Sequence, residues 1–180
     1  MRNAVLAALT VLYPLVVYLG LGHFEPRWLA FLLLGLALAR LTTSRERVWW
    51  AAAVLAAVLA LATFLANAAL PLKLYPVVVS GLLLALFAAS LAHPPTAIER
   101  LARLTTPDLP PKGVAYTRKV TWVWCAFFVL NGTLAAATAL WGSDAAWALY
   151  NGLIAYGLMG LLFGGEWLVR QRVMAGSAHV

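Results

Sequence analysis

Long apolar runs separated by short polar connections dominate the chain. Six of these runs are long enough, or nearly so, to cross a hydrocarbon layer about 30 Å thick as helices. They cover residues 3–22, 27–41, 48–69, 74–92, 120–141 and 145–169. A chain in lipid must pair its own backbone N–H and C=O groups, so each run is predicted to be an α-helix. The pattern therefore predicts an all-α fold, a polytopic membrane bundle of six transmembrane helices that forms a single domain over residues 1–180.

Composition supports a membrane protein and argues against a water-soluble one. The chain is 64% hydrophobic and only 11% charged, against roughly 45–50% and 25% in soluble domains. So few charges could not cover the wetted surface of a soluble domain of this length. The lipid bilayer is therefore the first partner that the sequence predicts.

The basic residues give the expected orientation. The formal net charge is +7, but the lysines and arginines lie between the apolar runs and form no stripe suited to nucleic acid. With the N-terminus in the cytoplasm, every Lys and Arg except Arg27 and Lys73 falls on the cytoplasmic side, as the positive-inside rule requires. Both termini are therefore expected inside. An interfacial aromatic belt is expected at the span ends, formed by Trp28, Trp49, Trp50, Tyr75, Trp122, Trp141 and Trp147.

The first apolar run has a second interpretation, a cleaved signal peptide. Met1 and Arg2 precede it, and Gly20 and Gly22 are small residues two apart. The run is longer than a usual signal core and no Ala-x-Ala follows, so a first span is favoured. A reporter fused to the N-terminus that stays attached to the mature protein would exclude cleavage.

Residues 93–119 form the only long polar connection. Thr96 and Glu99 have the spacing of a capping box, and Ile98, Leu101 and Leu104 follow at near-helical spacing. A short amphipathic helix on the cytoplasmic face is therefore predicted between spans four and five. Prolines are expected to break helices elsewhere: Pro71 ends the third span, and an extended turn precedes the fifth at Pro107, Pro110, Pro111 and Gly113.

Polar residues inside the spans are the candidates for function. Glu166 lies within the sixth span, four residues before Arg170, so an ion pair with Arg170, or with Arg118 or Lys119 of the fifth span, competes with a functional role. Asn131 and Ser80 are expected near the middle of the membrane, where they form an interhelical hydrogen bond or a polar step in a substrate path. Nearer the outer side, Asn67 and Asn151 are expected to pair in the same way.

No catalytic constellation, metal site or cofactor motif is visible. The three histidines fall in separate connections, and Cys125 has no neighbouring base. Gly160 and Gly164 form a small-residue motif that allows close helix approach, either inside the chain or in a homo-oligomer.

Three segments carry a family resemblance: KLYPVVVSGLLLALFAASL, IERLARLTTPDLPPKGVAYTRKVTWVWCAFFVLNGTLAAATALW and WALYNGLIAYGLMGLLFGGEWLVRQRV. The chain resembles a bacterial inner-membrane family encoded among acyl carrier protein, acyl-activating and dehydratase genes of aryl-polyene or fatty-acid-like pathways. Its last spans are distantly similar to intracellular septation protein A. The resemblance implies a multi-pass protein of the bacterial inner membrane with an accessory role in making an envelope lipid. The matching motifs contain Tyr116, Arg118, Lys119, Asn131, Tyr150, Asn151, Gly152 and Glu166.

Some members of that family carry a ketosynthase label. A ketosynthase needs a nucleophilic cysteine and two histidines in one pocket, and Cys125 and the histidines of this chain are dispersed. The label therefore does not fit this chain.

Three functions follow as hypotheses. The first is a non-enzymatic protein that organises lipid-like biosynthesis at the cytoplasmic face and binds anionic headgroups, an acyl carrier protein or other biosynthetic enzymes. Its basic residues would be Arg100, Arg103, Lys112, Arg118 and Lys119. The second is a small transporter or flippase that uses Asn131 and Ser80. The third is an intramembrane acyl or lipid transferase that uses Glu166 with Tyr116 or Arg118.

Overall fold

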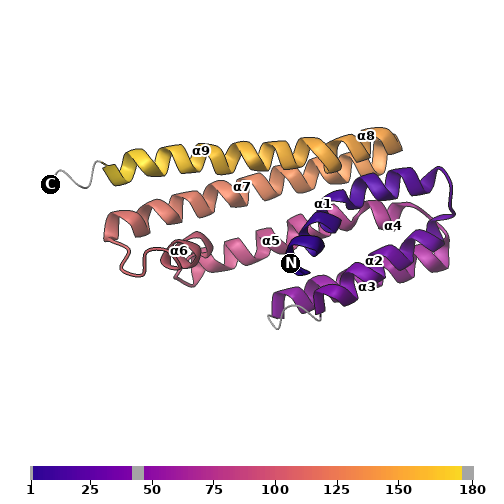
Figure 1. The fold of residues 1–180 in the computed structure, drawn as a ribbon, viewed down its shortest axis with the longest axis horizontal. Coiled ribbons are helices and arrows are strands. Elements are labelled where there is room, and N and C mark those ends of the chain that lie inside the picture. Colours follow the sequence, from indigo (N-terminus) through magenta and orange to yellow (C-terminus); the bar gives the residue numbers. More distant parts are fainter. Residues whose placement is uncertain (1, 42–46, 176–180) are drawn as a thin grey trace. The chain divides into compact units, whose positions relative to one another are not determined.

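The computed structural model of the chain describes residues 2–41 and 47–175, and within these two ranges the regular elements are all helices (Figure 1). The predicted all-α fold is thereby confirmed for the described part of the chain. The chain divides into two compact units. Unit 1 comprises Met1–Leu82 and Leu130–Tyr156, and unit 2 comprises Leu83–Val129 and Gly157–Val180.

Unit 1 contains the N-terminal helices and the hairpin near residue 142. The α2 and α3 helices lie side by side (Figure 1). The helices that lie wholly in unit 1 are α1 (Arg2–Leu21), α2 (Pro26–Leu41), α3 (Arg47–Ala66), α4 (Leu70–Lys73), α8 (Asp144–Leu149) and the π-helix η1 (Tyr150–Ile154). The helices α5 (Tyr75–Ala92), α7 (Pro111–Trp141) and α9 (Ala155–Ala175) contribute residues to both units.

The end of α3 is set by an asparagine and not by a proline. Asn67 follows the helix with a φ of 47°, a left-handed conformation that asparagine tolerates better than most residues. The prediction that Pro71 ends this span is wrong. Pro71 lies in the first turn of α4, where its missing N–H costs no helical hydrogen bond.

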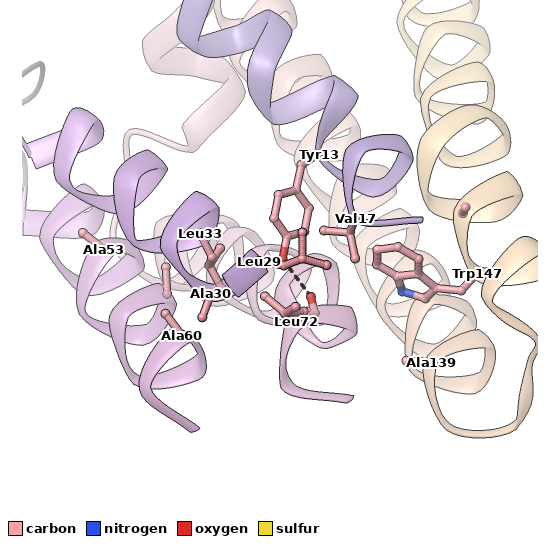
Figure 2. Packing of buried hydrophobic residues seen from close by; sticks show 12 residues of the cluster. Tyr13, Val17, Leu29, Ala30, Leu33, Ala53, Ala60, Leu72, Ala139 and Trp147 are labelled. Atoms are coloured by element: carbon pink, nitrogen blue, oxygen red, sulfur yellow. Dashed lines mark hydrogen bonds between the residues drawn. The ribbon is translucent and has the colours of Figure 1, made fainter. Parts of the chain in front are cut away.

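Two backbone carbonyls just before α5, those of Leu72 and Lys73, accept hydrogen bonds from distant side chains, and Pro76 in the first turn of α5 contributes to this arrangement. Pro76 has no N–H to donate to the Leu72 carbonyl four residues earlier. The hydroxyl of Tyr13 donates to this carbonyl at 3.1 Å (Figure 2). The indole Nε1–H of Trp147 donates to the Lys73 carbonyl at 3.0 Å. Trp147 is 0% exposed, so its predicted place in an interfacial belt is wrong.

The core of unit 1 surrounds these two hydrogen bonds. Val17, Leu33 and Leu72 are fully buried with Trp147 (Figure 2). Small residues on one face of α3 complete the cluster and let another helix approach closely; they are Ala53, Ala56 and Ala60. The side chains of Lys73 and Asp144 form an ion pair at the start of α8, and Ser143 caps that helix.

Unit 2 contains α6 (Ala97–Arg103) and an aromatic cluster. The predicted capping box is confirmed, because Thr96 and Glu99 each accept a hydrogen bond from the other's backbone N–H. The ring of Trp124 lies 4.6 Å from that of Phe163, measured between centroids. This aromatic contact joins α7 to α9 within unit 2.

The helix predicted as the fifth span begins earlier than the sequence suggested. Pro111 is the first residue of α7, a position where its fixed φ suits the helix and its missing N–H is not needed. The extended turn predicted through Pro111 and Gly113 is therefore wrong, and helix occupies much of the loop expected at 93–119. The sixth span, expected at 145–169, runs as α8, η1 and α9 from Asp144 to Ala175.

Three described helical stretches are long and apolar enough to cross a membrane: Leu70–Ala92, Pro111–Trp141 and Asp144–Gln171. Shorter apolar helical stretches lie in α1, α2 and α3. Side-chain burial points the same way, because Leu65 and Trp141 are largely exposed while Ser80, Glu99 and Asn131 are buried. A soluble protein shows the opposite pattern. These properties indicate association with a membrane.

The hydrogen bond of Tyr13 provides a test of this packing. Tyr13→Phe leaves the Leu72 carbonyl buried without its donor, and we expect the free energy of unfolding in detergent to fall by about 1–3 kcal/mol. Tyr18→Phe on the same helix is the control, since Tyr18 is exposed. Equal stability of the two variants in denaturant titrations would contradict this role.

Candidate functional site

A pocket of about 240 Å³ in unit 2 brings together three helices. Its lining residues come from α6 and the turn after it, from α7 and from α9. They are Ile98, Leu101, Ala102, Leu104, Thr105, Thr117, Val120, Trp124, Phe163, Glu166 and Arg170. On α7 and on α9 the lining positions recur at three- and four-residue intervals, so each helix presents one face to the pocket.

The pocket has an apolar part and a charged part. The apolar wall consists of Val120, Trp124 and Phe163. Of these residues, Val120 and Trp124 are buried. Glu166 and Arg170 lie farther along α9, so the lining changes from apolar to charged along one helix face. A site of this kind suits an amphiphilic molecule, with its chain on the aromatic wall and its polar head beside the two charges.

Glu166 is held only loosely. Its Oε1 atom lies 3.9 Å from Nε of Arg170 and 3.5 Å from the Tyr116 hydroxyl. Charge-assisted contacts usually measure about 2.5–2.9 Å, so both are long. The Tyr116 hydroxyl donates more closely, at 3.2 Å, to the backbone carbonyl of Glu166. The carboxylate side chain is only 19% exposed and retains capacity for another donor.

The predicted ion pair between Glu166 and Arg170 is present in the structure. The predicted alternatives on α7 do not form: Arg118 and Lys119 are exposed, and within the described ranges neither has an ion pair with Glu166. The structure thus brings Glu166 and Tyr116 together and leaves Arg118 and Lys119 outside the pocket.

The basic residues near α6 fall into two groups. Arg103 is used internally, because it binds the carboxylate of Glu99 at 2.8 Å and the Pro107 carbonyl at 2.8 Å. The others are exposed and, among the described residues, have no acidic partner; they are Arg100, Lys112, Arg118 and Lys119. These four side chains can meet an anionic surface or partner.

A second polar cluster lies in unit 1. The amide nitrogen of Asn131 donates to the Ser80 hydroxyl at 3.0 Å, and the Tyr150 hydroxyl donates to the Asn131 oxygen at 3.0 Å. The predicted hydrogen bond between Asn131 and Ser80 is confirmed. The contact with Tyr150 was not predicted. The short connection between α7 and α8 could have indicated it, because residues at similar distances before and after such a connection lie at similar heights along the two helices. Ser80, Asn131 and Tyr150 therefore use these side-chain groups in hydrogen bonds to one another.

Asn151 and Asn67 make separate contacts. The Asn151 amide nitrogen donates to the Trp147 carbonyl at 2.9 Å and to the Thr138 hydroxyl at 3.3 Å. The oxygen of this amide has no partner among the described residues. Asn67 accepts a hydrogen bond from the Arg27 backbone N–H at 3.2 Å. Neither asparagine belongs to the pocket of unit 2.

The glycine motif of α9 is open. A side-chain carbon added at Gly160 or Gly164 would meet no atom of the described chain within 4 Å. The interpretation as an internal packing contact is therefore wrong for the described residues. Contact with a second copy stays a prediction.

The described ranges contain no cluster of three or more His, Cys, Asp or Glu side chains placed to hold a metal ion. Cys125 is a buried free thiol. No family model matches the chain, and neither a curated protein nor a solved structure does. The geometry of the pocket is therefore the basis for its interpretation.

The cluster around Asn131 generates a stability prediction. In a double-mutant cycle with Ser80→Ala and Asn131→Ala, we expect a coupling free energy of about 0.6–2 kcal/mol, because each change removes the other residue's partner. Unfolding in detergent measures it. Ser90→Ala paired with Asn131→Ala is the control, since Ser90 bonds a backbone carbonyl of its own helix. A coupling of zero for the Ser80 pair would contradict the interaction.

Proposed function

We propose that this chain is a multi-pass protein of the bacterial inner membrane that holds the acyl chain of a lipid-like molecule at the cytoplasmic face. In this role it serves as an accessory of cell-envelope or lipid-like biosynthesis, of the aryl-polyene or fatty-acyl kind that the family resemblance implies. The observation that carries the proposal is the pocket of unit 2, whose apolar wall leads to the charged residues Glu166 and Arg170. Binding, and not catalysis, is the proposed activity.

We further propose six spans, with α1, α2 and α3 added to the three longer apolar stretches, and with both termini inside. Under this topology Arg27 and Lys73 are the outer cations. Each has an acidic partner in the structure: Glu25 lies 2.7 Å from Arg27, and Asp144 pairs with Lys73. The outer connections are thus close to neutral and the excess positive charge stays inside, as the positive-inside rule favours.

The α6 helix suits an interfacial position. Its acidic residue Glu99 is buried, whereas Leu101, and Leu104 just after the helix, are exposed. A helix on a water-facing surface would expose the acid and bury the leucines. Leucines exposed at an open apolar pocket beside the exposed Arg100 are typical of a helix lying in the headgroup region. The pocket, which α6 helps to line, would then open at the level of the lipid headgroups.

The exposed basic residues supply a docking surface for an acyl carrier protein, which is acidic. Arg100, Lys112, Arg118 and Lys119 lie on α6 and on the first two turns or so of α7, the same helices that line the pocket. Such an interface depends on charge and weakens as ionic strength rises. Salt sensitivity therefore separates carrier docking from apolar binding in the pocket.

The two alternatives have less support. A flippase would need polar groups free to meet a passing headgroup, and Asn131 and Ser80 are bonded to each other. A transferase has a specific contact in its favour, the 3.5 Å approach of Tyr116 to Glu166. Chemical turnover of a bound amphiphile that Glu166→Gln abolishes would establish the transferase in place of simple binding.

Cysteine labelling tests the topology. In a Cys125→Ala background, a membrane-impermeant maleimide should label His23→Cys in intact cells, because the α1–α2 connection is placed outside. Thr106→Cys should be labelled only after the membrane is opened. Both positions are exposed in the structure. Labelling of Thr106→Cys in intact cells would overturn the proposed orientation.

Photolabelling tests the pocket. Dodecanoic acid with a diazirine near its chain end should label Val120, Trp124 or Phe163, as read by mass spectrometry. Thr105→Trp should lower this labelling about fivefold, since an indole at the pocket lining displaces roughly 1 kcal/mol of apolar contact.

The matched control is Thr106→Trp. Thr106 is exposed next to Thr105 but does not line the pocket, so labelling should be unchanged. Label spread over outward residues such as Leu161, with no difference between the two variants, would contradict the proposed binding site.

A further inference from the structure

We infer that the ligand of this pocket is an acyl amide with a terminal anionic group: a chain, then an N–H donor, then an anion beyond it. The inference rests on the proposed function, because it assumes that an acyl chain occupies the apolar wall. The inference adds the chemistry of the ligand's polar head, which the binding of the acyl chain does not specify.

The order of groups along α9 sets the order of groups in the ligand. Phe163, Glu166 and Arg170 all line the pocket, and at 1.5 Å per residue Glu166 lies about 4.5 Å and Arg170 about 10 Å beyond Phe163 along the axis. The contacts of α7 follow the same order, because Trp124 contacts Phe163 and Tyr116 contacts Glu166. A chain leaving the aromatic wall meets a hydrogen-bond acceptor first and a cation second.

Glu166 selects a donor. Its two side-chain contacts are at 3.5 and 3.9 Å, whereas an ionised carboxylate can accept several short hydrogen bonds. A carboxylate with so little hydrogen bonding beside an apolar wall gains from any N–H that a ligand brings. The head of a plain fatty acid would instead place a second carboxylate at this level, and like charges repel.

Arg170 selects the anion. Its side chain is 48% exposed, and among the described residues its ion pair is the loose one with Glu166. A guanidinium binds a carboxylate or phosphate through parallel N–H donors, so a terminal anion can displace the weak internal contact. The amide N–H of the ligand then donates to the Glu166 carboxylate, which has lost its contact with Arg170. One ligand of this order improves the bonding of both residues.

Two commercial surfactants differ only in the substituent on the amide nitrogen. N-dodecanoylglycine and N-dodecanoylsarcosine share the chain and the carboxylate, but sarcosine carries a methyl group in place of the amide hydrogen. Each is used to displace the photoreactive dodecanoic acid from the full-length protein in lipid nanodiscs, at concentrations below micelle formation. We expect N-dodecanoylglycine to compete on the order of tenfold better than N-dodecanoylsarcosine, the usual effect of one hydrogen bond to a charged group.

Glu166→Leu identifies the source of that preference. In this variant we expect the two surfactants to compete equally, and dodecanoate to bind more tightly than in the parent because the repelling carboxylate is gone. The gain in dodecanoate binding also shows that the variant is folded. Tyr116→Phe, which keeps the carboxylate, should retain the preference for the glycine compound.

Two failures are distinguishable. If both surfactants displace the probe equally well from the parent protein, or if the preference survives Glu166→Leu, the assignment of the head is overturned while acyl binding stands. If the probe labels no pocket residue and no surfactant competes, the proposed function itself fails and the inference falls with it.

Discussion

An unpaired backbone carbonyl in an apolar interior costs free energy of the same order as a lost hydrogen bond, and this constraint organises unit 1. Pro76 removes the N–H that the Leu72 carbonyl would receive in a regular helix. Tyr13 of α1 supplies one donor and Trp147 of α8 supplies the next, at the Lys73 carbonyl. These two hydrogen bonds thereby join helices that are far apart in sequence. The ion pair of Lys73 with Asp144 lies at the same place, so one irregular turn fixes the positions of α1, α4 and α8.

The same constraint separates the structural polar residues from the functional candidates. Ser80, Asn131 and Tyr150 bond to one another inside unit 1 and need no ligand. Glu166 in unit 2 lies beside an apolar pocket, and its carboxylate has only long contacts within the part of the chain that the structure describes. Since native polar groups out of water are usually well bonded, the difference points to Glu166 as the residue with bonding capacity to spare. The charge of Arg170 at the adjacent turn makes the site selective for a head with both a donor and an anion.

The proposed role follows from where this pocket lies. The α6 helix that helps to line it exposes Leu101 beside Arg100, as a helix in the headgroup region does. A lipid-like chain could enter there from the membrane, or from a carrier protein docked on the exposed basic residues. The accessory role proposed from the sequence is of the same kind, and Tyr116 and Glu166, both singled out in the sequence, are in contact. Binding of an acyl chain at the membrane surface gives one function to the apolar wall, to the charged residues Glu166 and Arg170, and to α6.

The sequence by itself determined the features that depend on near neighbours. Long apolar runs gave the helices, the Thr96 and Glu99 spacing gave the cap of α6, and the four-residue spacing gave the pairing of Glu166 with Arg170. Prolines were harder to interpret, because a proline can lie either at the start of a helix or just after its end. Pro71 and Pro111 both lie at helix starts. Only the tertiary structure decided that Trp147 is buried, that Tyr150 binds Asn131, and that α6, α7 and α9 enclose a pocket. The reason is physical: apolar periodicity specifies that a helix forms, whereas the partner of a side chain depends on which distant segments pack against it.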